Sequence, residues 1–67
     1  MTILLNDVST PLPKEIISLA DLVNWKNIPS QGTAIALNNK LIKQAQWAVT
    51  TLNDLDQITI ISAAYGG

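Results

Sequence analysis

The sequence predicts an α+β domain in which one short helix packs on one face of a mixed β-sheet. Its 67 residues allow a single core. Most apolar residues lie in short runs bounded by Asn, Asp, Pro or Gly, as is typical of strands. Only one stretch, residues 19–27, combines helical spacing with a capping residue.

The first two strands are expected to form a hairpin. Thr2–Leu5 alternates so that Ile3 and Leu5 share one face and Leu4 lies on the other. Asn6-Asp7 supplies the turn, because both side chains can bond nearby backbone amides. Residues 8–12 would return as a second strand. Pro11 and Pro13 cannot donate ladder hydrogen bonds, so this strand belongs at a sheet edge.

The helix is predicted over residues 19–27. Ser18 is placed to cap it, and Asp21 three residues later completes a weak capping box. Leu19, Leu22 and Val23 then follow at helical spacing. The stretch from Pro29 to Gly32 ends the helix and turns the chain.

A second hairpin is predicted after the helix. Residues 33–37 form a strand in which Ile35 and Leu37 face the core and two alanines face away. Asn38-Asn39 can make a two-residue turn, since asparagine tolerates positive φ. Leu41-Ile42 would be the partner strand. Residues 44–51 fit either a helical turn or an irregular crossing.

The last strand runs from Ile58 towards Ala63 and is expected to pair with the first strand in the middle of the sheet, where the most apolar strands have the most neighbours. Ile58 and Ile60 would face the helix. Leu4, Ile61 and Ala63 would then lie on the opposite face. Because apolar patches on soluble monomers often mark docking sites, these three residues are a predicted partner-docking face.

Composition excludes several classes of function. The chain has no cysteine, histidine or arginine, and its net charge is −1. Disulfides, thiolate metal sites and cysteine nucleophiles are therefore ruled out, and no basic patch supports nucleic-acid binding. The N-terminal segment is too short in apolar residues for a membrane span. We expect a cytoplasmic protein that binds no metal and no cofactor and is not an enzyme.

Two further groups of side chains have structural explanations. Trp25 and Trp47 are each expected to contribute apolar area to a small core, Trp25 less securely because it lies near the exposed helix end. Asp54 and Asp56 lie two apart in a turn, a spacing that caps turns more often than it forms an acid-base pair.

The C-terminus carries the strongest functional signal. After Ala64 and Tyr65 the chain ends in Gly66-Gly67, and these are two of only three glycines. Glycine has no Cβ, so another protein can close tightly around it. The four residues 64–67 are therefore predicted to be a flexible tail that carries the Gly67 carboxylate into a partner's active site.

In order and spacing these features resemble the ThiS family, the ubiquitin-like sulfur carrier proteins of thiamine biosynthesis. The similarity covers nearly the whole chain, and its parts are residues 3–7, 18–23, 34–38, Trp47, residues 54–58 and Gly66-Gly67. The resemblance implies a β-grasp fold over residues 1–67.

The resemblance also implies a mechanism. An E1-like adenylyltransferase of the ThiF type would use ATP and magnesium to adenylate the Gly67 carboxylate. A persulfide-bearing sulfur donor would convert it to a thiocarboxylate, which would pass its sulfur to a thiazole synthase of the ThiG type. Gly66, Tyr65 and Ala64 would thread the partner active sites. The chain itself would be a protein cosubstrate in the cytoplasm, or in the plastid stroma.

Two positions depart from the family pattern. Asp54-Leu55-Asp56 stands where the family usually has Asp-Gly-Asp, so either Leu55 takes a strained positive φ or the turn differs. Lys43-Gln44 replaces a frequent Pro-Arg. Alternatives remain open: the small subunit of molybdopterin synthase, another ubiquitin-like carrier, or a β-grasp interaction module whose glycines are incidental.

Overall fold

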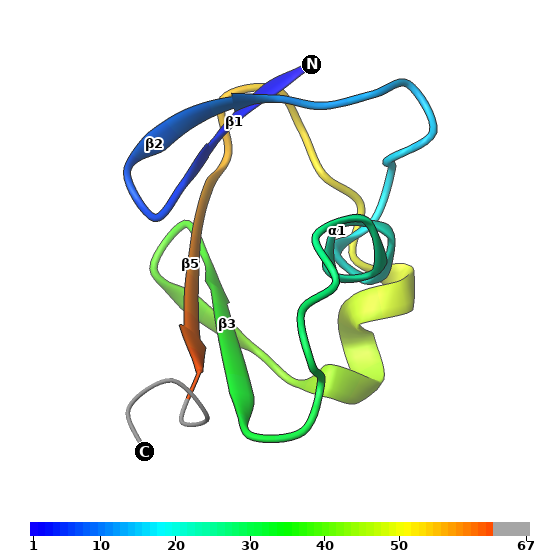
Figure 1. Ribbon diagram of the computed structural model, residues 1–67. Coiled ribbons are helices and arrows are strands. Elements are labelled where there is room, and N and C mark those ends of the chain that lie inside the picture. Colours follow the sequence, from blue (N-terminus) through cyan, green and yellow to red (C-terminus); the bar gives the residue numbers. More distant parts are fainter. Residues whose placement is uncertain (63–67) are drawn as a thin grey trace.

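The computed structural model describes residues 1–62 as one five-stranded sheet with an α-helix and a 3₁₀ helix on one side (Figure 1). The strands stand in the order β2-β1-β5-β3-β4. The elements in chain order are β1 (Thr2–Leu5), β2 (Val8–Pro11), α1 (Leu19–Trp25), β3 (Thr33–Leu37), β4 (Lys40–Ile42), the 3₁₀ helix η1 (Gln44–Val49) and β5 (Gln57–Ser62).

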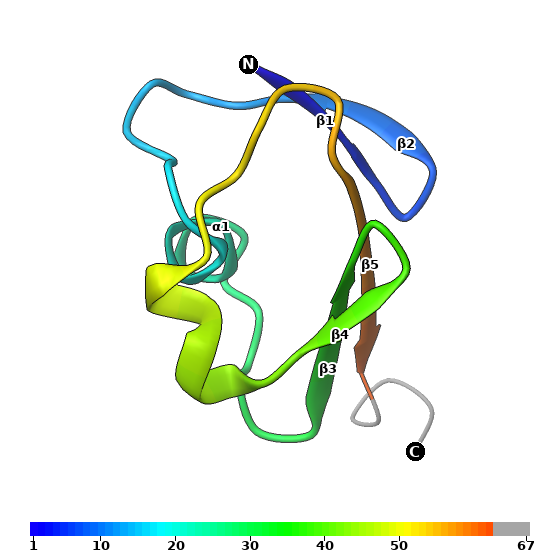
Figure 2. The same cartoon turned by 180° about the vertical axis from the view of Figure 1, so that it is seen from behind.

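The centre of the sheet is β5, which lies between β1 and β3 (Figure 2). It runs parallel to β1, with Leu5 opposite Ile58, and antiparallel to β3, with Ile35 opposite Ile60. The sequence-based prediction that the first and last strands pair in the middle is confirmed. The edge position of β2 is also confirmed, and Pro11 there needs no ladder donor.

Hydrogen bonds at both ends fix the length of α1. Ser18 and Asp21 form the predicted capping box, each side chain accepting from the other residue's backbone N–H. The helix ends at Trp25, two residues earlier than predicted. Asn27 takes a left-handed φ of 55°, and the Ile28 N–H then reaches back to the Val23 carbonyl at 3.0 Å. This is the Schellman arrangement, which asparagine can adopt in place of glycine.

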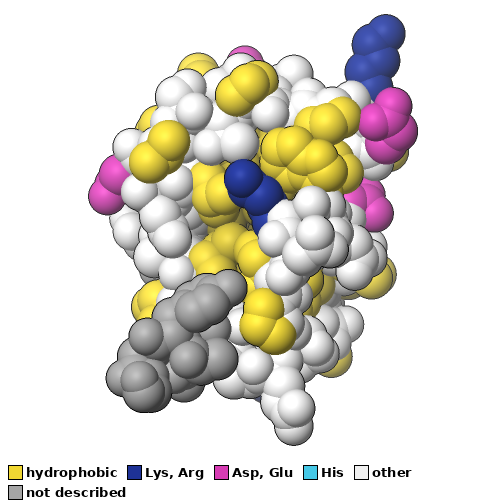
Figure 3. All heavy atoms as spheres, viewed as in Figure 1, with side chains coloured by type: hydrophobic (Ala, Val, Ile, Leu, Met, Phe, Trp, Pro, Cys, Tyr) yellow, Lys and Arg dark blue, Asp and Glu magenta, His cyan; other side chains and the backbone are white. Residues whose placement is uncertain are grey.

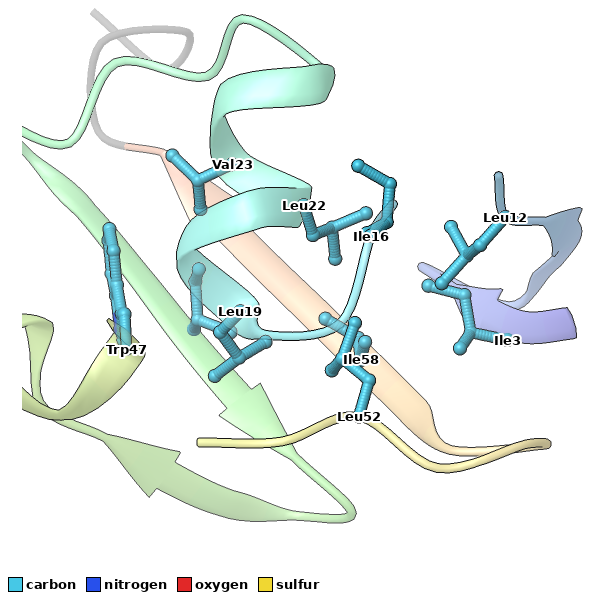
Figure 4. Close-up of a cluster of buried hydrophobic side chains, with 10 residues drawn as sticks. Ile3, Leu12, Ile16, Leu19, Leu22, Val23, Trp47, Leu52 and Ile58 are labelled. Carbon is cyan, nitrogen blue, oxygen red and sulfur yellow. The ribbon is translucent and has the colours of Figure 1, made fainter. Parts of the chain in front are cut away.

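The core fills the space between the sheet and α1 (Figure 4). Leu19 and Leu22 are completely buried and project from the helix towards the sheet residues Ile3 and Ile58. Ile35 of β3 belongs to the same buried cluster. The cluster also contains Val23 of α1, Trp47 of η1, and Leu12, Ile16 and Leu52 of the connecting segments. None of the helices in residues 1–62 is long and apolar enough to cross a membrane.

The two tryptophans differ. Trp47 is buried, as predicted, and its indole N–H donates to the Ile42 carbonyl at 3.0 Å. Trp25 is 39% exposed, so the prediction that it fills the core is wrong. Trp25 lies within α1 but away from the face formed by Leu19, Leu22 and Val23, so its ring is at the surface, with the Lys26 ammonium 5.2 Å from its centre.

The turn before β5 is strained at one residue. Leu55 has φ of 68°, and its N–H donates to the Thr2 carbonyl at 2.6 Å. A left-handed conformation is costly for a residue with a branched side chain, and this side chain is 69% exposed, so no burial offsets the strain. Of the two possibilities raised by the sequence, the strained turn is the one observed.

Replacing Leu55 with glycine is therefore expected to stabilise the protein. Relief of the left-handed strain exceeds the added chain entropy of glycine, and the net gain should be about 0.5–1 kcal/mol in the free energy of unfolding. Urea titration followed by circular dichroism measures it. Leu55→Ala is the control, because alanine keeps the Cβ and should give no gain. Equal gains in both variants would show that the strain is not the cause.

Candidate functional site

The structure places β5 as the strand that leads to the C-terminal residues (Figure 1). Its pairing with β3 continues to Thr33 opposite Ser62. The predicted tail residues Ala64, Tyr65, Gly66 and Gly67 lie outside the described residues, as does Ala63 of the predicted docking face. What the structure defines is the base from which these residues extend.

The start of β5 is held by side-chain hydrogen bonds. Asp54 accepts the Thr2 N–H at 2.8 Å, and the buried Asp56 accepts the Asn53 N–H at 2.7 Å and the Asn38 side-chain amide at 3.0 Å. Both aspartates thus accept hydrogen bonds that stabilise the turn before β5, as their spacing predicted. Their carboxylate oxygens stabilise backbone N–H groups.

The face of the sheet away from α1, here called the open face, is uncharged in the described residues. Directly paired residues point to the same side of a sheet, so the register assigns to it Thr2, Leu4, Ser9, Pro11, Ala34, Ala36, Leu41, Gln57, Thr59 and Ile61. Leu4 and Ile61 therefore lie on the predicted side. Ile61 is 62% exposed and directly opposite Ala34.

The apolar part of the open face is centred on β3 and its two neighbours. Leu41 is 67% exposed and lies opposite Ala36, two residues along β3 from the Ala34–Ile61 pair. Leu4 lies opposite Gln57, four residues before Ile61 and so about 13 Å away along the strand. Sequence reasoning missed Leu41. Its alternation with the core-facing Ile42 is the signal that identifies it.

The helix side carries more charge than the open face. In Figure 3 a basic side chain crosses the apolar side chains between the sheet and the helix, and basic and acidic side chains gather at the upper right. Within residues 1–62, no three potential metal ligands gather. Lys43, where the family pattern departs, is exposed just before η1 and makes no cap hydrogen bond.

Backbone hydrogen bonds at the helix start lower the pKa of one carboxyl group. The Asp21 carboxylate accepts the backbone N–H groups of Ile17 and Ser18, at 3.0 and 3.1 Å, and these bonds lower its pKa below the ordinary 3.8. A depressed pKa stabilises the fold above the unfolded-state pKa. That contribution is lost as the pH falls through the folded-state pKa.

We expect the Asp21→Asn variant to have a flatter acid limb than the wild type. Below about pH 4 the wild type must protonate Asp21 and lose its two charge-assisted hydrogen bonds, whereas the variant has no charge to lose. The free energy of unfolding from urea titrations at several pH values between 2 and 6 measures the difference. Parallel acid limbs in the two proteins would contradict the assignment.

Comparisons with known proteins agree with this architecture. The model of the ThiS family matches residues 3–67. The fold is similar to the crystal structure of a thiamine biosynthesis protein (ThiS) from Geobacter metallireducens, with a TM-score of 0.82 and 14% identity over 92% of this chain and 93% of that one. At this identity the similarity demonstrates the fold alone. No curated protein sequence matches the chain.

Proposed function

Because this chain belongs to the ThiS family of sulfur carrier proteins in thiamine biosynthesis, we propose that its C-terminal Gly67 carboxylate is the group that carries sulfur. The family match extends through residue 67, so it includes the Gly66-Gly67 ending. This is the observation on which the proposal rests. The chain then acts as a protein cosubstrate, and the enzymes are its partners.

The chemistry needs an activated carboxyl group, because a free carboxylate is a poor electrophile. The Gly67 carboxylate attacks the α-phosphorus of ATP on an E1-like adenylyltransferase, and pyrophosphate leaves. The terminal sulfur of a protein persulfide attacks the acyl carbon and displaces AMP. A second thiol then attacks the resulting acyl disulfide, which releases the thiocarboxylate and leaves a disulfide on the thiol proteins.

All sulfur redox steps fall to the partners, because this chain has no cysteine. The same holds for general acid-base work at neutral pH, since it has no histidine. The thiocarboxylate is the sulfur donor to thiazole synthase. Tyr65 and Ala64 line the entrance to the partner active sites, and Gly66 passes through it without a Cβ.

The open face is the proposed docking surface. It combines exposed apolar side chains, Leu41 and Ile61, with an absence of charge in the described residues. The surface borders β5, the strand that continues into the tail. A partner that covers it receives Gly67 at a distance set by the last residues of the chain.

The test is the intact mass of the purified chain after incubation with ATP, a ThiS-activating enzyme and a sulfur donor. The proposal predicts a mass gain equal to the replacement of one oxygen by sulfur, and fragmentation should place it on Gly67. An unchanged mass with an enzyme known to be active would refute the carrier function and favour an interaction module.

A further inference from the structure

Asn6 extends the sheet along β5 with its side chain. The strand β1 ends at Leu5, opposite Ile58, and the Asn6 backbone N–H donates to the Ile58 carbonyl at 2.8 Å. Two residues further along β5, the Ile60 N–H donates to the Asn6 side-chain oxygen at 2.7 Å. The Asn6 side-chain nitrogen donates to the Ile60 carbonyl at 3.3 Å. The amide side chain thus pairs both backbone groups of Ile60, as a continued β1 would.

The backbone of Asn6 explains why this position suits asparagine. Asn6 and Asp7 have φ of 48° and 67° and form the two-residue turn between Leu5 and Val8. Glycine and asparagine both tolerate the left-handed conformation. Only asparagine also supplies a peptide-like amide. Glycine would be sufficient for the turn alone. The hydrogen bonds to the backbone of Ile60 require the asparagine side chain.

Asn38 makes similar backbone and side-chain hydrogen bonds at the opposite end of β5. It is also the first residue of a two-residue turn, with φ of 51°. Its N–H donates to the Gln57 carbonyl at 2.7 Å, and its side-chain oxygen accepts the Gln57 N–H at 2.9 Å. The side chains of Asn6 and Asn38 therefore hold β5 near its two ends, and only Asn6 acts on the end from which residues 63–67 continue.

We infer that Asn6 is a positioning residue for the C-terminal carboxylate, an inference that rests on the proposed function. On the β1 side, the paired register stops at Ile58, and the Asn6 side chain carries the pairing on to Ile60. Without that side chain, β5 beyond Ile58 is held from the β3 side alone in the described residues. The base of the tail then samples more directions and must be ordered again each time a partner binds.

The effect should fall on binding rather than on chemistry, because Asn6 lies far along the chain from the reacting group. For Asn6→Gly we expect about a tenfold rise in the KM of the activating enzyme for this chain, the equilibrium equivalent of ordering about one more residue of backbone. The kcat should stay within about twofold, since the bound complex is the same. ATP–pyrophosphate exchange gives both constants.

Asn38→Gly is the matched control. It makes the same substitution at the same turn position with nearly the same φ. It also removes a side-chain hydrogen bond to β5, the one that accepts the Gln57 N–H. Because it breaks an additional bond to Asp56, it should destabilise the fold at least as much. A merely structural role for Asn6 predicts equal KM changes in the two variants. A positioning role predicts a KM within about twofold of the wild type for Asn38→Gly.

Two further measurements complete the test. Amide hydrogen exchange should show lost protection at Ile60 in Asn6→Gly and retained protection at Ile58. Asn6→Asp keeps an acceptor for the Ile60 N–H and loses the donor, so its KM should fall between those of the wild type and Asn6→Gly. This milder variant also decides the question if the glycine variant does not fold.

The outcomes separate this inference from the proposed function. A KM rise confined to the two Asn6 variants supports the positioning role. An unchanged KM in both, or equal KM changes in Asn6→Gly and Asn38→Gly, overturns it while the wild-type chain still gains sulfur. No gain of sulfur by the wild-type chain overturns the proposed function and this inference with it.

Discussion

Deleting Gly67 should abolish thiocarboxylate formation while leaving the fold unchanged. The deletion moves the terminal carboxylate back by one residue, or about 3.5 Å of extended chain. A misplacement of about 1 Å already costs roughly a hundredfold in rate when reacting groups must meet in a fixed geometry. The intact-mass assay should therefore show no sulfur gain over the time in which the wild type reacts completely.

An alanine appended after Gly67 should be equally inactive, because it moves the carboxylate outward and buries a Cβ where glycine passes. The matched control is an alanine added before Met1, at the opposite end of the chain. That variant should react at the wild-type rate, since Met1 is 46% exposed. Sulfur gain in the deletion or the C-terminal extension would show that the glycine ending does not carry the reaction.

The strands could be predicted because their signals are local. Alternation in Thr2–Leu5 and in Thr33–Leu37 gave the observed bounds, and Asn38-Asn39 marked the hairpin turn that the structure contains. These features depend on neighbouring residues only. The pairing of β1 with β5 also followed from their apolar character, since the central strands have the most neighbours to bury them.

The sequence-based predictions fail where the local structure depends on contacts with distant parts of the chain. The helix end depends on the left-handed Asn27, a conformation that the sequence permits without requiring. The exposure of Trp25 depends on which face of α1 the sheet covers. The sequence leaves residues 44–51 open between a helical turn and an irregular crossing, and the 3₁₀ helix η1 corresponds to the first of these. Side-chain amides that bond backbone across the sheet, as Asn6 does, leave no periodic signal at all.

Within the candidate site, the sequence predicted the side of the sheet on which a residue lies but not which residues are close together. Leu4 and Ile61 were assigned to the open face by alternation alone, and the register places both there. The distance between Leu4 on β1 and Ile61 on β5, and the proximity of Leu41 to the Ala34–Ile61 pair, depend on which strands are neighbours and in which register. Such information lies in the sheet as a whole and not in any one segment.

A large loss of stability is expected when a residue on the buried face of β5 is truncated. Ile58 is 1% exposed within the core, whereas Ile61, three residues later on the same strand, is 62% exposed on the open face. Ile58→Ala should lower the free energy of unfolding by about 2–5 kcal/mol, through lost burial and the cavity that remains. A domain of this size has only about 3–10 kcal/mol of stability in total, so much of the variant should be unfolded at 37 °C.

Ile61→Ala is the matched control, with the same substitution on the same strand. Its stability should change by less than about 1 kcal/mol, the scale of strand propensity, and its affinity for the activating enzyme should fall instead. Urea titration and a binding assay on both variants separate the two effects. Equal destabilisation would contradict the assignment of the faces, and a full-strength complex with Ile61→Ala would remove that residue from the docking surface.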